Sequence, residues 1–244
     1  MRTNRFSIVE EGKPLWPESY LARPIDPNHC KNVLEGAYDV PYWPEKPPVI
    51  LDIGANIGAF TRWAVKRWPG CTVHAYEPQP DNYKLLEQTV SNLDVINCVH
   101  TYPKAVTDKN GTGKLFNHAF NCGEFSFFRQ GGDAESREPK DIVEVETIAG
   151  MDLPKADILK LDCEGSEGSI LASLYAANRL MDFSAIMLEY HNEQDGINIR
   201  NGLEFNGFTV TGEDAMAQHR GELQFVRNDL LPVTDLDETS HHAK

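Results

Sequence analysis

Short apolar runs alternate along most of the chain with longer segments in which apolar positions recur at helical spacing. The run at 49–51 leads to Asp52, a glycine-bearing turn and a predicted helix over 60–68. A second strand is expected over 72–77, a helix over 80–91 and a third strand over 95–102. Such strand–helix units, joined by right-handed crossovers, are typical of a parallel, doubly wound sheet.

Residues 107–150 interrupt this alternation. Asn110-Gly111 and Gly131-Gly132 are turn signals, and 142–147 alternates with period two. We expect an antiparallel insertion between the third and fourth strands, with a mobile loop over 130–140. The insertion is followed by elements listed in order: strand 158–162, helix 166–180, strand 185–189, helix 197–206 closed by Gly207, and strands near 208–210 and 223–226 that form a hairpin.

The two ends of the chain differ from this central part. Residues 1–46 are rich in proline, which favours an irregular arm with a short helix near 28–35. Residues 233–244 are acidic and poor in apolar side chains, so we expect a flexible tail. The predicted organisation is an arm over 1–46 that packs on the domain, one α/β domain over 47–232, and the tail.

Composition narrows the class of protein. The 23 Lys and Arg against 37 Asp and Glu give a net charge of −14, which disfavours a nucleic acid or an anionic membrane as partner. Five scattered cysteines without CxxC spacing indicate neither a disulfide framework nor a zinc site, and fit a reducing cytoplasm. No apolar run approaches the roughly 20 residues that span a bilayer.

The first strand–helix–strand unit has the features of a nucleoside site. Its turn is Gly54-Ala55-Asn56-Ile57-Gly58, and Glu77 ends the second strand, where a carboxylate can accept hydrogen bonds from a ribose diol. The middle glycine of a dinucleotide fingerprint is absent, and Asp52 favours a cationic cofactor over phosphates. S-adenosylmethionine is thus preferred to NAD, while a dinucleotide dehydrogenase and a turn that binds nothing stay open.

Four motifs together resemble a known family: "VILDIGANIGAF", "AYEP", "DILKLDCEGSE" and "IMLEYH". They are similar to the FkbM family of S-adenosylmethionine-dependent methyltransferases, over roughly Val33 to Phe208, with Cys163 where a small aliphatic residue is usual. The resemblance implies the class I Rossmann-like fold and methyl transfer, often to a hydroxyl of a small molecule, sugar or natural product. It also implies cofactor contacts at Pro78 and at Ala105, where the chain of the related fold passes the adenine.

Four polar residues stand at the expected carboxyl ends of the fourth and fifth strands: Asp162, Glu164, Glu189 and His191. Asp162 is placed to hold the cofactor ammonium or orient the acceptor, and Glu164 to act as general base or to cap the next helix with Ser166. His191 suits a base at neutral pH, although a lone histidine is often structural. Carboxylates suit magnesium but imidazole does not, so no metal is predicted.

Two other functions stay open at this stage. One is N-methylation of a small amine, which needs less base catalysis and which acidic residues would attract as a cation. The other is a cofactor-binding scaffold without turnover. The expected partner is a small-molecule or sugar acceptor, self-association is left open, and Tyr38, Tyr42 and Trp43 of the arm are expected to close over the cofactor.

Overall fold

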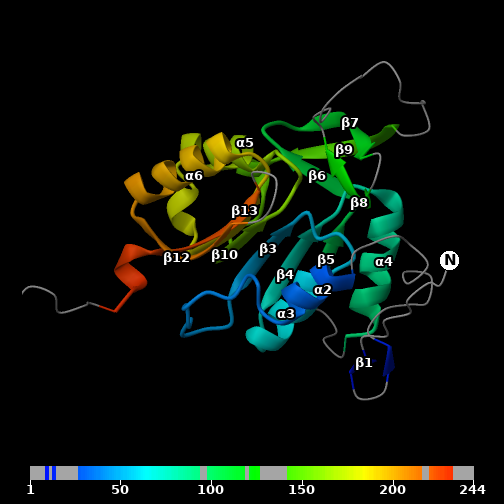
Figure 1. Cartoon of the computed structure of the whole chain (residues 1–244), viewed down its shortest axis with the longest axis horizontal. Helices are drawn as coiled ribbons and strands as arrows, with labels where there is room; N and C mark the ends of the chain where they lie inside the picture. Colours follow the sequence, from blue (N-terminus) through cyan, green and yellow to red (C-terminus); the bar gives the residue numbers. More distant parts are fainter. Residues whose placement is uncertain are drawn as a thin grey trace, which may run out of the picture.

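A computed structural model of the chain describes residues 9–10, 13–14, 27–93, 98–118, 121–126, 142–215 and 220–232. Its main feature is a seven-stranded sheet (Figure 1). In spatial order the strands are β12 (Phe208–Ala215), β13 (Gly221–Arg227), β11 (Ala185–Tyr190), β10 (Ile158–Leu161), β3 (Val49–Ile53), β4 (Thr72–Tyr76) and β5 (Val99–Tyr102).

The sheet is mostly parallel. Strands β3, β4, β5, β10 and β11 run in one direction, and only β13 runs against its neighbours β11 and β12. This arrangement confirms the predicted doubly wound sheet and its closing hairpin. Since the parallel strands end at one edge, the residues after β3, β4, β10 and β11 meet there.

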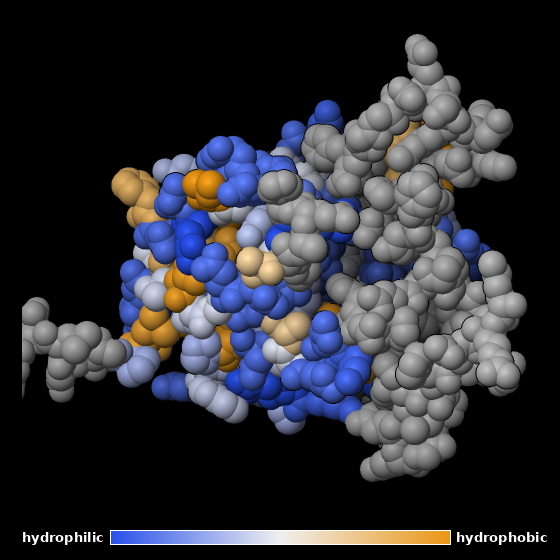
Figure 2. Space-filling view, in the orientation of Figure 1, coloured by the Kyte–Doolittle hydropathy of each residue, from blue (hydrophilic) through white to orange (hydrophobic). Residues whose placement is uncertain are grey.

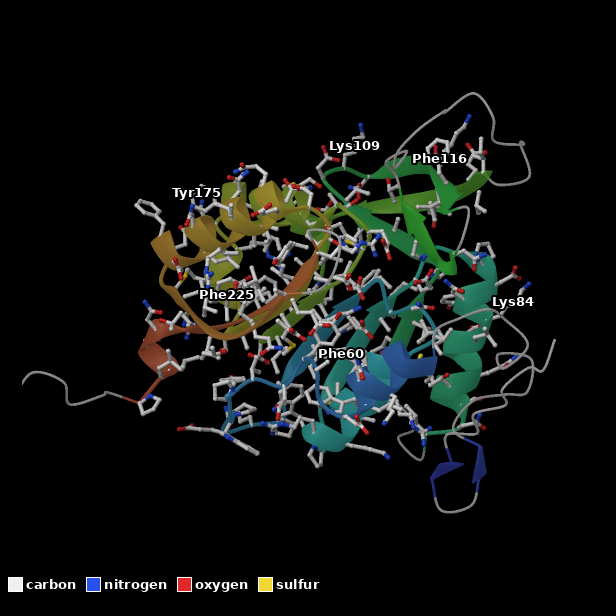
Figure 3. The ribbon with its side chains drawn as sticks, viewed as in Figure 1. Phe60, Lys84, Lys109, Phe116, Tyr175 and Phe225 are labelled. Carbon is white, nitrogen blue, oxygen red and sulfur yellow. The ribbon has the colours of Figure 1, made fainter. Side chains whose placement is uncertain are left out.

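Helices cover both faces of the sheet, which explains the nearly continuous apolar strands. One face packs against α2 (Pro27–Leu34), α3 (Ala59–Arg67) and α4 (Pro80–Ser91), and the other against α5 (Glu167–Ala176) and α6 (Glu193–Phe205). Ile50 and Ile158 point to the first face, whereas Leu51 and Leu159 point to the second. Phe60 and Phe225 mark the two cores in Figure 3.

The insertion forms a second, four-stranded sheet in the order β6 (Lys104–Thr107), β9 (Ile142–Ala149), β7 (Gly111–His118) and β8 (Asn121–Ser126). Its β7 strand is antiparallel to β8 and β9, as predicted, but β6 pairs with β9 in parallel. Ala105, Leu115 and Val145 form its small core. The expected loop over 130–140 lies outside the described residues.

Three element boundaries differ from the sequence-based ones. Helix α5 ends at Ala176, short of 180, and Asn178 then adopts a left-handed φ of 55°. Helix α6 begins four residues early because the Asn192 side chain accepts a hydrogen bond from the Asp195 amide at 2.8 Å. The third strand begins at Val99 in the described part, and 94–97 lie outside it.

The end of the predicted arm packs on the domain. Arg67 of α3 donates to the Asp39 carboxylate at 2.7 Å and its guanidinium lies 3.8 Å from the centre of the Trp43 ring. Gln224 of β13 donates to the Ala37 carbonyl, and Tyr38 is 1% exposed. Strands β1 (Val9–Glu10) and β2 (Lys13–Pro14) pair further upstream. The predicted boundary at 46 stays a prediction.

The described surface is polar overall. Figure 2 shows hydrophilic residues over most of one face, with apolar residues between them. Within the described residues, none of the helices combines the length and apolar character needed to cross a bilayer.

The turn between β3 and α3 requires its glycines. Gly54 has a φ of 75°, and a Cβ there would lie 1.7 Å from the carbonyl oxygen of Asp162. Gly58 has a φ of 86°, and a Cβ there would lie 2.9 Å from Cδ1 of Leu86 on α4. The first glycine thus lets two backbones touch, and the second lets α4 approach the turn.

We expect Gly54→Ala to destabilise the protein by at least about 2 kcal/mol, because left-handed strain adds to a clash with backbone that cannot rotate away. The matched control is Gly202→Ala in α6, where a Cβ would meet nothing within 4 Å. That change should stabilise by about 0.5–1 kcal/mol. Urea denaturation measures both, and equal stabilities for the two variants would contradict the close approach.

Candidate active site

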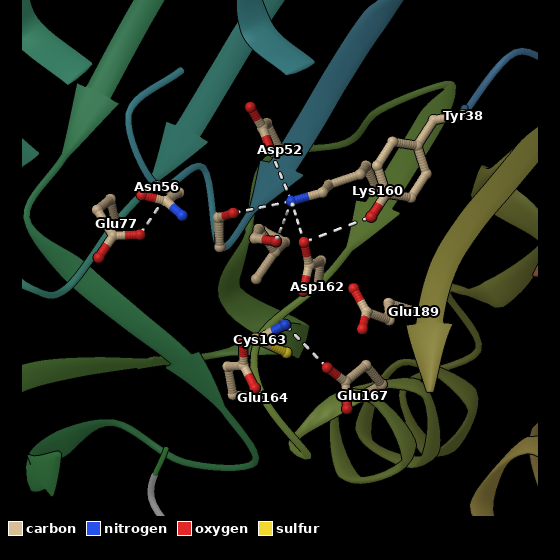
Figure 4. Close-up of polar contacts among 12 residues, drawn as sticks. Tyr38, Asp52, Asn56, Glu77, Lys160, Asp162, Cys163, Glu164, Glu167 and Glu189 are labelled. Atoms are coloured by element: carbon tan, nitrogen blue, oxygen red, sulfur yellow. Dashed lines mark hydrogen bonds and ion pairs between the residues drawn. The ribbon is translucent and has the colours of Figure 1, made fainter. Parts of the chain in front are cut away.

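The charged residues of the site lie on one face of four neighbouring strands. Asp52 of β3 and Lys160 of β10 are directly paired in the parallel register, and Glu189 of β11 is paired with Glu222 of β13. All four continue the rows of core residues that face α2 and α3, such as Ile50 and Ile158. Tyr38 lies over the same face (Figure 4).

Glu77, directly after β4, is held against the glycine turn. Its carboxylate accepts hydrogen bonds from the Asn56 amide at 2.8 Å and from the Gln79 amide at 2.9 Å. Burial raises the pKa of Glu77 to about 7, although these two bonds act against the rise. Pro78 lies between Glu77 and Gln79 in the sequence. The predicted cofactor contacts Asn56, Glu77 and Pro78 are therefore next to one another.

The amides of the turn are already in use. Those of Gly54 and Ala55 donate to the Tyr76 carbonyl, that of Asn56 to Glu77, and that of Gly58 to the Ala55 carbonyl. These four amides thus have partners within the protein. The space beside the two glycines is also taken by protein, by the Asp162 carbonyl at Gly54 and by α4 at Gly58.

Lys160 is the residue that the sequence-based search missed. Its ammonium lies 3.5 Å from Asp52 Oδ1, 3.5 Å from Asp162 Oδ2 and 2.8 Å from the Gly54 carbonyl oxygen, to which it donates. Burial alone would lower the pKa of Lys160, but the two carboxylates outweigh burial and raise it. Lys160 is consequently a permanent cation between the glycine turn and the end of β10.

This cation changes the role assigned to Asp52. The Asp52 side chain is 0% exposed and also accepts a hydrogen bond from Thr61 at 2.6 Å. Burial raises its pKa, while Lys160 and Thr61 act against that rise. Asp52 is thus paired with Lys160 inside the protein, and its direct attraction for a cationic cofactor stays a prediction.

The turn after β10 is capped by Glu167. Its carboxylate accepts hydrogen bonds from the amides of Cys163 at 2.8 Å and Gly165 at 3.0 Å, in a turn where Glu164 has a φ of 58°. Ser166 precedes the helix without a side-chain capping bond. The Ser166 side chain therefore does not cap this helix, and Glu167 satisfies the amides of the turn.

His191 is enclosed by carboxylates. Its Nε2 lies 3.1 Å from Glu164 and 3.7 Å from Glu189, and its Nδ1 lies 3.4 Å from Glu167. The distances are those of ion pairs, although neither ring nitrogen has an aligned hydrogen bond. Burial lowers the pKa of His191, but Glu164 and Glu167 outweigh burial and raise it to about 11. A charged imidazolium has no lone pair that could accept a proton. At neutral pH His191 would therefore not act as the base that the sequence predicted.

Glu189 and Glu222 form the remaining part of the site. Burial and the charge of Asp162 raise the pKa of Glu189 to about 8 and that of Glu222 to about 7. The Tyr38 hydroxyl donates to Asp162 at 3.4 Å and is electrostatically coupled to both glutamates. Glu222 was also missed, although it directly precedes the apolar run at 223–226.

The structure brings together most of the residues chosen from the sequence, with one exception. Ala105 is 3% exposed and packs with Leu115 and Val145 in the second sheet, so its side chain belongs to that core. Any cofactor contact there would use its backbone.

Asp162, Glu164 and His191 have ligand atoms within 4.8 Å of one another and could approach a common metal ion. The His191 imidazole would first have to lose the proton that its ion pairs with Glu164 and Glu167 stabilise. We assign these residues no metal role.

Comparison with known proteins identifies the family. The model of the methyltransferase FkbM domain matches residues 52–227. Methyltransferase sdnD of Sordaria araneosa is 25% identical over 227 residues, covering 80% of this chain and 84% of that protein. The 31-O-demethyl-FK506 methyltransferase FkbM of Streptomyces tacrolimicus is 37% identical over 67 residues, covering 28% of this chain and 25% of that protein.

A solved structure shows the same fold. The crystal structure of methyltransferase FkbM from Methylobacillus flagellatus KT superposes with a TM-score of 0.53 at 14% identity. The match covers 74% of this chain but only 43% of that one, so the chain spans less than half of its length.

The sheet order and these matches define an S-adenosylmethionine-dependent methyltransferase with the class I Rossmann-like fold. The chain belongs to the FkbM methyltransferase domain family. The family match begins at Asp52 and extends through the closing hairpin, whereas the sequence motifs indicated a range from Val33 to Phe208.

We expect Lys160→Met to destabilise the protein by about 3–5 kcal/mol, because it leaves two buried carboxylates without their cation. Adding Asp52→Asn to that variant should recover part of the loss. The control is Lys84→Met, whose exposed pair with Asp81 should be worth about 0–1 kcal/mol. Urea denaturation would contradict the role of Lys160 if both lysine variants lost the same small amount.

We expect His191 to stay protonated through pH 9, because its pKa is raised to about 11. Nitrogen-15 spectra of the imidazole rings measure this directly. His74 is an internal control, because burial and His100 lower its pKa. Its ring should therefore be neutral at any pH above the ordinary pKa of a histidine. A His191 ring that loses its proton near pH 6.5 would restore it as a candidate base.

Proposed function

We propose that this protein transfers a methyl group from S-adenosylmethionine to a hydroxyl of a small molecule, such as a sugar or a natural product. The observation that carries the proposal is Glu189, a buried carboxylate beside Asp162 with a pKa raised to about 8. Such a group is a stronger base than an exposed carboxylate. One relative is named for methylation at an oxygen, 31-O of demethyl-FK506.

The residues at the turn fit the nucleoside end of the cofactor. Glu77 is 6% exposed, and its carboxylate accepts a hydrogen bond from the Asn56 amide of the glycine turn. In the proposed arrangement Glu77 accepts from the ribose diol, while Gly54, Ala55, Asn56, Gly58, Pro78 and the backbone of Ala105 line the cofactor. When bound, S-adenosylmethionine supplies an electrophilic methyl group on a sulfonium.

The residues around Glu189 prepare the acceptor. Glu189 takes the proton of the acceptor hydroxyl, so that the oxygen can attack as its negative charge develops. Asp162 orients the acceptor, because Lys160 and the Tyr38 hydroxyl fix its carboxylate from two sides. His191 holds Glu164 by charge and acts as a positioning residue. Much of the rate comes from this alignment with the methyl carbon.

N-methylation of a small amine is the second candidate. The acidic surroundings of Asp162, Glu189 and Glu222 favour it, because they attract a cation. A neutral amine already has its lone pair and needs no base. Nucleic acid is a poor acceptor for a chain of net charge −14. Cys30, Cys71, Cys98 and Cys163 form no disulfide, which fits the proposed cytoplasmic location.

The test is turnover with S-adenosylmethionine on a panel of alcohols and amines, with the methylated atom located by mass spectrometry and NMR. Calorimetric titration with S-adenosylmethionine and NAD checks the cofactor. Tight binding of NAD alone would overturn the proposal. Cofactor binding without turnover on any acceptor would favour a catalytically silent scaffold.

We expect Glu189→Gln to lower kcat/KM by about 10²–10⁴-fold, because the acceptor proton loses its base. In the unmodified enzyme kcat/KM should fall as pH drops below about 8, since protonation removes the base. Glu144→Gln, an exposed acid on β9, is the control and should keep full activity. If Glu189→Gln kept its turnover and its pH profile, the base assignment would be wrong.

A further inference from the structure

Glu222 is an acid whose burial is not explained by a partner. It is 6% exposed, and its carboxylate has neither a hydrogen bond nor an ion pair with any of the described residues. Burying a carboxylate without compensation is unfavourable, so such a group either binds a proton or meets a cation. The buried Glu222 carboxylate therefore points to a ligand that supplies a positive charge.

The cations nearby are already engaged. Lys160 lies between Asp52 and Asp162, and His191 lies between Glu164 and Glu167. Arg220 acts on Glu189 and lowers its pKa, but it is not among the groups that act on Glu222. Glu189 also lies 3.7 Å from His191 Nε2, whereas Glu222, its neighbour on the adjacent strand β13, has no ion pair with the described residues.

Each of the two cations is shared by at least two carboxylates, so the cluster as a whole carries excess negative charge. Burial and the charge of Asp162 raise the pKa of Glu189 to about 8 and that of Glu222 to about 7. A cation bound beside Glu222 would supply the missing positive charge. An ammonium group also has three donors, enough to reach both carboxylates.

The position of Glu222 places this pair on the acceptor side. Three strand intervals separate β13 from β3, which is about 14 Å at the usual spacing of neighbouring strands. Glu77 directly follows β4, which is the strand on the far side of β3. Glu222 and the proposed ribose contact are thus at opposite ends of the site, with Asp162 between them.

We propose that Glu222, together with Glu189, binds a protonated amino group of the methyl acceptor, which makes the acceptor an amino alcohol or amino sugar. The inference rests on the proposed function and names its substrate class. A protonated amine has no lone pair to attack the methyl carbon, so Glu222 directs methylation to the neighbouring hydroxyl. Glu222 is therefore a specificity-determining residue.

The test uses protein saturated with S-adenosylhomocysteine and labelled with carbon-13 at its glutamate carboxyl groups. The probes are 3-amino-1-propanol and its neutral counterpart 1,3-propanediol. We expect saturable shifts of the Glu222 and Glu189 signals with the amine and none with the diol. Glu222→Gln should weaken amine binding at least tenfold, while the exposed-site control Glu144→Gln should bind like the unmodified protein.

Glu222→Gln is expected to fold, because glutamine has the same shape and removes a buried charge without a partner; circular dichroism checks this. The proposal is overturned if the amine causes no saturable shift, or if folded Glu222→Gln binds it equally. It is also overturned if the amine binds only to protein that is free of S-adenosylhomocysteine, which would assign the pair to the cofactor. Binding of Mn²⁺ in place of the amine would make it a metal site.

This test separates two kinds of failure. Loss of the proposed function would appear as absent binding of S-adenosylhomocysteine or absent methylated product in the turnover assay. Failure of the inference alone would appear as normal cofactor binding without amine-dependent shifts.

Discussion

The buried ammonium of Lys160 is the interaction on which the rest of the site depends. It lies between Asp52 on one strand and Asp162 at the end of the next, and it donates to the carbonyl of the glycine turn. Without this cation the carboxylates of Asp52 and Asp162 would lie close together with no positive charge between them, which is unfavourable. Lys160 therefore balances their charge and links β3, β10 and the glycine turn.

A second cation, His191, has a similar role directly after the neighbouring strand β11. His191 is held between Glu164 and Glu167, and Glu167 in turn caps the amides of the loop after β10. Two cations thus organise the carboxylates around these strand ends, including Glu189, which lies 3.7 Å from His191. In the proposed function the acids that act on the substrate are Glu189 and Glu222.

The strands, the glycine turn and the strand-end acids could be predicted because each leaves a local pattern of apolar runs and turn residues. Lys160 could have been found in part, since it alternates with Leu159 and Leu161 inside an apolar strand and shares its face with Asp162. The protonation of His191 could not, because Glu164 and Glu167 reach it only through the folded turn. Likewise, the sequence of β6 does not show that it leaves the main sheet for the second one.

The contact between Gly54 and the Asp162 carbonyl has a further consequence. Because no side chain fits between these two backbones, the glycine turn and the loop after β10, which the proposed function assigns to cofactor and acceptor, are in direct contact. A ligand that pushed one segment toward the other would meet backbone, which cannot rotate away as a side chain can. New acceptor specificities in such an enzyme would therefore arise at β13 and the arm, where side chains can change without moving the reacting centre.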